Sequence, residues 1–473
     1  MTANTISYGD IKISGYQLVS VVQLQIVQAI NEHAEMQING LVPEDIRESY
    51  LKEFEVNKPI QVEKGDVTLF NGIIVELEVT HINSKYYISI RALSHTYIMD
   101  VVKKKRSFQD TEMKFGDLVE VVISQYGKTN FMDMVTNDAL IKKPIIQYKE
   151  TDWEFLKRMA SRFYTVLVPH CISEGVNFYF GLSNVDKGEI EAYNYHCIKD
   201  ISRYRESVQG IPGVSENDFV FYEVETNKNL NIGEAVTFKG KKMYVIKSIL
   251  KEQKDAKLTN TCILAFEAGV KRPRLTNNNI SGCSIFGCVI ATARDTVKVH
   301  LEIDKKQDVS KAYWYPYATM YASEDETGWY CMPEINDTIR LYFPDDEEEK
   351  AMAINSVKPH DPDEDVEKLD PDNRMANTDV KYLRTAFGKE LKFRPDGIDV
   401  ISKDGLVFMT LSDDGTVTIN SNDKISFTAA NDIEMKARNV NVEATDHIKI
   451  EAKESSIDLE SDIIVKGKEV KTN

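Results

Sequence analysis

The carboxy-terminal end of this 473-residue chain repeats a short motif about every eight residues. In each unit, two apolar residues stand at positions i and i+2, and a small residue follows. The first residues of successive units are separated by 8, 8, 7, 8, 9 and 6 positions. The seven units are Val417/Ile419/Ser421, Ile425/Phe427/Ala429, Ile433/Met435/Ala437, Val440/Val442/Ala444, Ile448/Ile450/Ala452, Ile457/Leu459/Ser461 and Ile463/Val465/Gly467.

Alternation with a period of two is typical of β-strands that have one apolar face. Each strand here spans only about five residues before a polar pair such as Asn431-Asp432 turns the chain. Strands this short do not enclose a core within one chain, so we expect three chains to wind around a shared axis. The sequence therefore predicts an intertwined, triple-stranded β-helix over 387–473. A monomeric β-solenoid and a hairpin sandwich are the alternatives.

The paired apolar residues of the first six units are predicted to point at this axis and to form the trimer core of a needle. These residues are Val417, Ile419, Ile425, Phe427, Ile433, Met435, Val440, Val442, Ile448, Ile450, Ile457 and Leu459.

The rest of the chain also reads as mainly β. Residues 1–275 contain short alternating runs, which predict two β-barrels with helical inserts. The clearest runs are Ile73–Val79, Tyr86–Ala92, Phe178–Leu182 and Met243–Leu250.

Two segments of this region have helical periodicity. The first is 114–126, and the second is 152–164, where Asp152 is predicted as the N-cap and Trp153 begins an apolar stripe. That stripe is interpreted as core packing.

Residues 280–358 have the size of an OB-fold barrel, with five or six short strands. A segment rich in Lys, Arg, Pro and Asn precedes this region, and an acidic, Pro-containing linker over 359–386 follows it. The predicted strands are Gly287–Ala291, Thr296–Leu301, Tyr315–Met320, Trp329–Met332, Thr338–Phe343 and Ala351–Val357.

Composition argues against several classes of protein. The chain has 75 acidic and 58 basic residues and a net charge of -17, which disfavours binding to nucleic acid. The one compact basic run, 103–106, is predicted to be a solvated loop. No segment has the roughly 20 consecutive apolar residues that cross a bilayer, and the amino terminus lacks a signal peptide pattern. We therefore expect assembly in the cytosol, with the six sparse cysteines reduced.

Three stretches resemble the VgrG-like spike proteins of contractile injection systems, which are similar to the fused hub and spike of contractile phages. They occur in the order of that family and, with the repeat, extend over nearly the whole chain. They are YISIRALSHTYIMDVVKKKRSFQD (87–110), IIQYKETDWEFLKRMASRFY (145–164) and GWYCMPEINDTIRLYFPDDEEEKAMAINSV (328–357).

The resemblance implies a structural protein of a phage tail, R-type bacteriocin, extracellular injection particle or type VI secretion system. It implies a homotrimer whose amino-terminal hub forms a pseudo-sixfold ring against an inner tube protein and baseplate components. Unlike some relatives, the chain has no room for a lysozyme domain before the needle and no His-x-His apex site. We therefore expect a separate PAAR-like tip protein to cap the needle, at an end that includes Ile463 and Val465. The resemblance also implies that the target membrane is contacted only transiently.

Few patterns in the chain indicate catalysis or metal binding. The pairs His170-Cys171 and His196-Cys197, and the spacing of Cys283 and Cys288, lack the matched pairs of a zinc site. The acidic run 345–349 is predicted to be a solvated turn, although paired carboxylates also serve glycoside hydrolysis. We therefore predict no catalytic, cofactor or metal residues. A tail-fibre or adhesin-like protein and a spike with cell-wall hydrolase activity are the alternatives.

Overall fold

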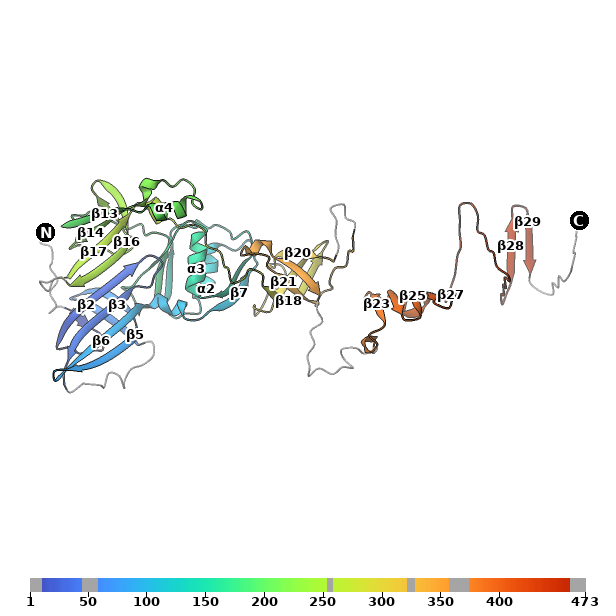
Figure 1. Cartoon of the computed structure of the whole chain (residues 1–473), viewed down its shortest axis with the longest axis horizontal. Helices are drawn as coiled ribbons and strands as arrows, with labels where there is room; N and C mark the ends of the chain where they lie inside the picture. Colours follow the sequence, from blue (N-terminus) through green and yellow to red (C-terminus); the bar gives the residue numbers. More distant parts are fainter. Residues whose placement is uncertain (1–10, 45–57, 253–257, 321–327, 357–373, 460–473) are drawn as a thin grey trace, which may run out of the picture. The chain divides into compact units, whose positions relative to one another are not determined.

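The computed structural model describes residues 11–44, 58–252, 258–320, 328–356 and 374–459. The chain divides into two compact units, 1–359 and 360–473, which are described separately. The fold is mainly β (Figure 1). Within the described ranges, no helix is long and apolar enough to span a bilayer.

A 12-stranded sheet dominates the first unit. Its strands are β1 Ile11–Ile13, β2 Ser20–Ala29, β3 Glu35–Val42, β4 Pro59–Lys64, β5 Val67–Ile82, β6 Lys85–Ser94, β12 Asp186–Glu189, β13 Asn194–Lys199, β14 Val220–Thr226, β15 Ala235–Phe238, β16 Lys241–Glu252 and β17 Leu258–Ala265. The main path is β1-β4-β5-β6-β3-β2-β16-β17-β14-β13, and β15 pairs with both β12 and β16.

The sheet joins two halves that are distant in sequence. Each half has its own hydrophobic core, one around Leu24, Ile38 and Phe70 and the other around Phe219 and Val245. The antiparallel pairing of β2 with β16 connects them. Three of the predicted runs lie within β5, β6 and β16, so alternation located these strands correctly.

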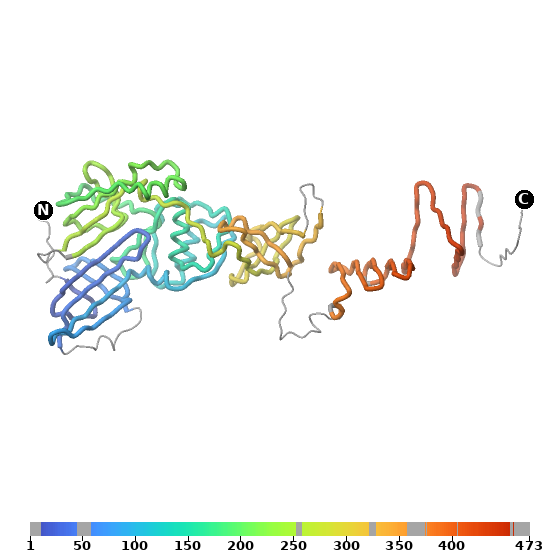
Figure 2. The backbone as a smooth tube through the Cα atoms, in the orientation of Figure 1, coloured from blue at the N-terminus to red at the C-terminus, as the bar shows by residue number. Residues whose placement is uncertain are grey.

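A smaller layer of helices and short strands is formed by the residues that come between the two halves in the sequence (Figures 1 and 2). Its core includes Trp153 and Phe155, which are almost fully buried. The helices of the first unit are α2 Phe115–Ile123, α3 Asp152–Ser161, α4 Ile201–Val208 and α5 Glu267–Val270, with 3-10 turns η2 His95–Asp100, η3 Glu216–Phe219 and η4 Glu348–Lys350. The short strands of this layer are β7 Lys104–Phe108, β8 Thr129–Asp133, β9 Ile145–Glu150, β10 Leu167–Pro169 and β11 Val176–Phe180.

Both predicted helices are present, but the predicted N-cap of the second is wrong. Thr151 caps α3: its hydroxyl accepts a hydrogen bond from the Glu154 amide, and the Glu154 carboxylate accepts one from the Thr151 amide. Asp152 is instead the first helical residue. Its carboxylate is therefore free to bind other partners.

A closed five-stranded barrel follows, as the sequence predicted. Its strands are β18 Ser284–Ala293, β19 Thr296–Leu301, β20 Trp314–Ala318, β21 Thr338–Tyr342 and β22 Met352–Ser356. The predicted strand Trp329–Met332 is absent. Because β20 pairs directly with β22, the barrel closes without an additional strand.

Tyr315 in the barrel core provides a test of this packing. Its side chain is fully buried, and its hydroxyl has no hydrogen-bond partner among the described residues. A buried, unpaired hydroxyl costs about 1–3 kcal/mol. We therefore expect Tyr315→Phe to preserve or raise the free energy of unfolding, as measured by denaturant titration. The matched control is Tyr126→Phe, which removes a hydrogen bond to Asp152 and should destabilise; a loss of stability in Tyr315→Phe would contradict the expectation.

The second unit begins with a five-stranded antiparallel meander and continues to a two-stranded hairpin. Residues 422–447 between these two elements contain no strand (Figure 1). The elements of this unit are η5 Arg374–Ala376, β23 Lys381–Arg384, β24 Glu390–Arg394, β25 Gly397–Ser402, η6 Lys403–Gly405, β26 Val407–Ser412, β27 Val417–Ser421, β28 Ile448–Ala452 and β29 Ser455–Leu459.

Candidate functional site

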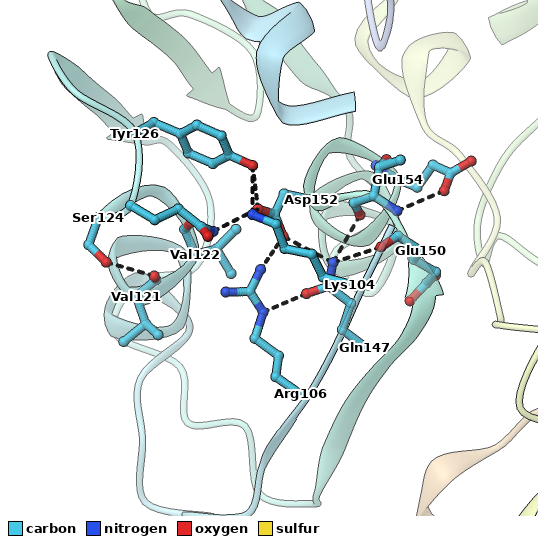
Figure 3. Close-up of polar contacts among 12 residues, drawn as sticks. Lys104, Arg106, Val121, Val122, Ser124, Tyr126, Gln147, Glu150, Asp152 and Glu154 are labelled. Carbon is cyan, nitrogen blue, oxygen red and sulfur yellow. Dashed lines mark hydrogen bonds and ion pairs between the residues drawn. The ribbon is translucent and has the colours of Figure 1, made fainter. Parts of the chain in front are cut away.

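Asp152 is the centre of a buried polar cluster (Figure 3). It lies at the start of α3, and its side chain has no exposed surface. Lys104 of β7 donates a hydrogen bond to one carboxylate oxygen at 2.7 Å, and Arg106 donates to the other. A carboxylate between two cations is neutralised without access to water. The cluster therefore fixes β7 against the first turn of α3.

Three further donors complete the coordination of this carboxylate. They are Gln125, Tyr126 and Gln147, at 2.8, 2.5 and 3.0 Å. Burial by itself raises the pKa of Asp152, but the hydrogen bonds from Lys104 and Tyr126 and the charge of Arg106 lower it below its ordinary value. Asp152 therefore stays ionised at neutral pH.

A second buried network connects α3 to the barrel. Arg158 forms a bidentate ion pair with Glu150, with both N–O distances at 2.8 Å. Its third nitrogen donates to Glu348 of η4 at 2.5 Å, and Arg162 donates to the other oxygen of Glu348 at 3.1 Å. Both Arg158 and Glu348 are almost fully buried. Two glutamates and two arginines thus join elements 190 residues apart in the chain.

Hydrogen bonds from β7 and the residue that follows it also reach the barrel. The amide and hydroxyl of Ser107 donate to the two oxygens of Asp304 at 2.7 and 2.5 Å. Gln109 donates to the carbonyl of Val299 at 3.1 Å. Burial raises the pKa of Asp304, and the bonds from Ser107 oppose that shift. We call the contacts of Arg158, Ser107 and Gln109 with the barrel the junction.

The structure corrects two predictions about charged runs. Residues 103–106 are not a solvated loop, because Lys104 and Arg106 bind Asp152 from β7. Likewise, the acidic run 345–349 is not wholly solvated, because Glu348 is buried on Arg158. The physical reason is the same in both cases: the partner charges come from distant elements, which a local pattern does not reveal.

The candidate metal-binding residues of the sequence lie in separate places. Cys171 is buried, and burial raises the pKa of its thiol to about 12. Cys197 is exposed on β13, whereas Cys283 and Cys288 lie at the barrel. Over the ranges that the structure describes, no three His, Cys, Asp or Glu side chains gather as a metal site would require.

The predicted needle residues have apolar side chains that the single chain does not cover. Phe427 is 71% exposed and Met435 is 77% exposed, and Val442 is similar at 67%. Val417, Ile419, Ile425, Ile433, Val440, Ile450 and Ile457 are also exposed, and Ile448 is half-buried. The side chain of Leu459 and both predicted cap residues, Ile463 and Val465, lie outside the described residues.

Comparison with known proteins identifies the barrel. The family model of the "Type VI secretion system/phage-baseplate injector OB domain" matches residues 287–357. A search of curated proteins finds no match.

Solved structures resemble this chain over a region that extends well beyond the barrel. The Escherichia coli protein c3393 is 12% identical with a TM-score of 0.54, over 74% of this chain and 99% of that one. It is described as a component of the type VI secretion system with structural similarity to the T4 tail proteins gp27 and gp5. Chains of the Francisella PdpA–VgrG complex, half-lidded and lidded, are 9% identical with TM-scores of 0.50; each covers 85% of this chain, and this chain covers 83% and 76% of them. The chain thus has a VgrG-like fold with an injector-type OB domain.

Proposed function

We propose that this chain is the central spike protein of a contractile, phage-tail-like injection machine and that it acts mechanically, without catalysis. The injector-type OB domain at 287–357 supports this role, and so does the fold shared with c3393, a type VI secretion component. In this role the junction has a clear purpose, because it keeps the OB barrel fixed to the amino-terminal sheets when force is applied.

The observation that carries the proposal is the exposed apolar repeat that follows an injector-type barrel. Side chains such as Phe427 and Met435 would be covered if three copies surrounded a common axis. Residues 422–447 have backbone groups without strand partners in one chain, and neighbouring chains would supply those partners. The functional unit is therefore a homotrimer with a membrane-piercing needle.

The partners follow from this arrangement. The amino-terminal sheets would contact an inner tube protein and baseplate components, and a PAAR-like tip protein would cover the distal end of the needle. A trimeric tail-fibre or adhesin-like protein is the second candidate, because it too would cover the repeat. The amino-terminal fold, which is shared with a secretion-system protein, favours the spike. A spike with hydrolase activity is favoured by no described cluster of residues.

Native mass spectrometry of the purified chain tests the proposal. We expect a species of three times the 53.9 kDa chain mass that binds an inner tube protein of a contractile injection machine. The same preparation should release no muropeptides from cell walls and should not bind surface glycans. A monomeric protein would contradict the proposed three-chain needle. Glycan binding without tube binding would support the tail-fibre protein instead.

A further inference from the structure

A cavity of about 270 Å³ lies where the two halves of the large sheet meet the smaller layer. Gln28 of β2 lines it from the first half, and Lys187 of β12 and Glu234 line it from the second. His170, which follows β10, and Tyr179 of β11 line it from the smaller layer. The cavity is formed within one chain, so its presence does not depend on the proposed trimer.

The walls of the cavity are held by backbone contacts. The His170 amide donates to the carbonyl of Asn177 at 2.9 Å, and the Gly233 amide donates to the carbonyl of Val245 at 2.7 Å. Gly233 has a φ of 79°, and a Cβ there would come to 2.9 Å from the side chain of Val168. Glycine therefore permits a close approach that a side chain would strain. The cavity is preformed, as small-molecule sites usually are.

Two polar side chains that line the cavity make no hydrogen bond to any described residue. Gln28 is only 8% exposed, and its amide has unused donors and an unused acceptor. The imidazole of His170 is likewise without a hydrogen bond. Burial lowers the pKa of His170 against the opposing charge of Glu234, so the ring stays uncharged at neutral pH. Burial of such groups without partners is unfavourable, which indicates that ordered water or a polar ligand satisfies them.

The cavity also contains an ion pair with unused hydrogen-bonding capacity. The Glu234 side chain is 10% exposed, and its carboxylate pairs with Lys187 at 3.3 Å. It also accepts from the backbone and side-chain amides of Asn231 at 3.0 and 3.4 Å. A carboxylate has about four acceptor positions, and an ammonium group has three donors. These contacts use three of the positions on Glu234 and one donor of Lys187, so both groups can also bind a ligand.

The balance of charge in the cavity restricts the class of ligand. An anion would lie beside the buried carboxylate of Glu234, and a cation would lie beside the ammonium of Lys187. A zwitterion pairs with both groups and adds no net charge. Gln28 and His170 supply further, uncharged donors. The volume is below the roughly 300–1,000 Å³ of sites for drug-sized molecules, which suits a molecule as small as an amino acid.

We propose that this cavity is a binding site for a small zwitterion of the amino-acid type. The ammonium group of the ligand donates to Glu234, and its carboxylate accepts from Lys187 and from the Gln28 amide. Because these residues come from both halves of the large sheet, a bound ligand joins the halves to each other. The ligand binds only the folded chain and therefore stabilises it by mass action.

Titration calorimetry of the full-length chain with the common L-amino acids tests the site. At least one of them should bind and raise the unfolding temperature. The corresponding α-hydroxy acid lacks the ammonium group and the corresponding carboxamide lacks the carboxylate, so each should bind at least about tenfold more weakly. Binding of glucose, a neutral polyol, without binding of any amino acid would overturn the assigned ligand class. Binding of none of these compounds would mean that the cavity holds water only, and it would overturn the proposal.

Two variants locate the ligand in the cavity. Glu234→Gln should weaken binding of the amino acid at least about tenfold but leave binding of its α-hydroxy acid unchanged, because that compound has no ammonium group. Gln28→Leu should weaken binding of the amino acid, whereas the matched control Gln25→Leu, on β2 but outside the cavity lining, should bind as the wild type does.

The comparison of the two compounds separates a lost contact from a damaged fold. Equal weakening of both by Glu234→Gln would overturn the assigned ammonium contact, since a general loss of structure affects both alike. Unchanged affinity in Glu234→Gln and Gln28→Leu would overturn the site. Each of these failures would leave the proposed spike intact, because native mass tests the trimer separately.

Discussion

Replacement of Arg158 by alanine is expected to lower the free energy of unfolding of the first unit by about 3–5 kcal/mol, the cost of breaking a buried ion pair from one side. The substitution leaves Glu150 and Glu348 buried without their shared cation. It also removes the donor to the carbonyl of Ile146. Denaturant titration monitored by tryptophan fluorescence would measure the loss.

Two control variants separate the network from a general effect of lost charge. Lys128→Ala breaks a pair with Glu174 whose partners are both exposed, so stability should be nearly unchanged. Arg158→Lys keeps the charge but not the bidentate geometry, and it should fall between the wild type and Arg158→Ala. If Arg158→Ala were as stable as Lys128→Ala, the junction would not depend on this network.

Asp152→Asn is expected to cost about 3 kcal/mol at neutral pH, because Lys104 and Arg106 then lose the charge that balances them. The amide also replaces one carboxylate oxygen by an NH2 group, which presents hydrogens to the donor at that position, either Gln125 or Gln147. The expected measurement is the difference in free energy of unfolding between the variant and the wild type.

This difference should depend on pH in a defined direction. The pKa of Asp152 is lowered in the folded protein. Its stabilising contribution is therefore fully present above the pKa of an unfolded aspartate, about 3.9, and is lost as the pH falls through the lower folded value. The deficit of Asp152→Asn should consequently shrink as the pH falls below about 4. A deficit that is constant over this range would mean that Asp152 acts through shape and not through charge.

Local patterns in the sequence were sufficient for several strands and for two helices. Alternation predicted β5, β6 and β16, and helical periodicity predicted α2 and α3. These signals can be found in short segments, because burial of one face makes apolar residues recur about every two positions in a strand and about every 3.6 positions in a helix. The cap of α3 was misassigned by one residue, since Thr151 and Asp152 are both good N-caps and only the structure shows that the Asp152 carboxylate has other partners.

The junction was not predictable in the same way. Arg158 lies in a segment whose apolar stripe was recognised, but nothing nearby in the sequence indicates Glu348, which lies 190 positions away. The same holds for Ser107 and Asp304. A charged residue at the boundary of an apolar stripe was the only available signal, and it does not name a partner. Buried ion pairs between distant elements depend on the tertiary fold and therefore lie beyond any local pattern.

The pairing of β2 with β16 also has a consequence for synthesis of the chain. Val27 pairs with Ile249 and Gln25 with Lys251, so the edge of β2 has no partner until the ribosome has made more than half of the chain. Until then, the amino-terminal half presents an open strand edge on an apolar core, the kind of surface on which nascent chains aggregate. During this interval the exposed edge of β2 must be kept from other chains. A chaperone that binds it, or slow initiation of translation that keeps ribosomes on the same message far apart, would favour the complete sheet over aggregation.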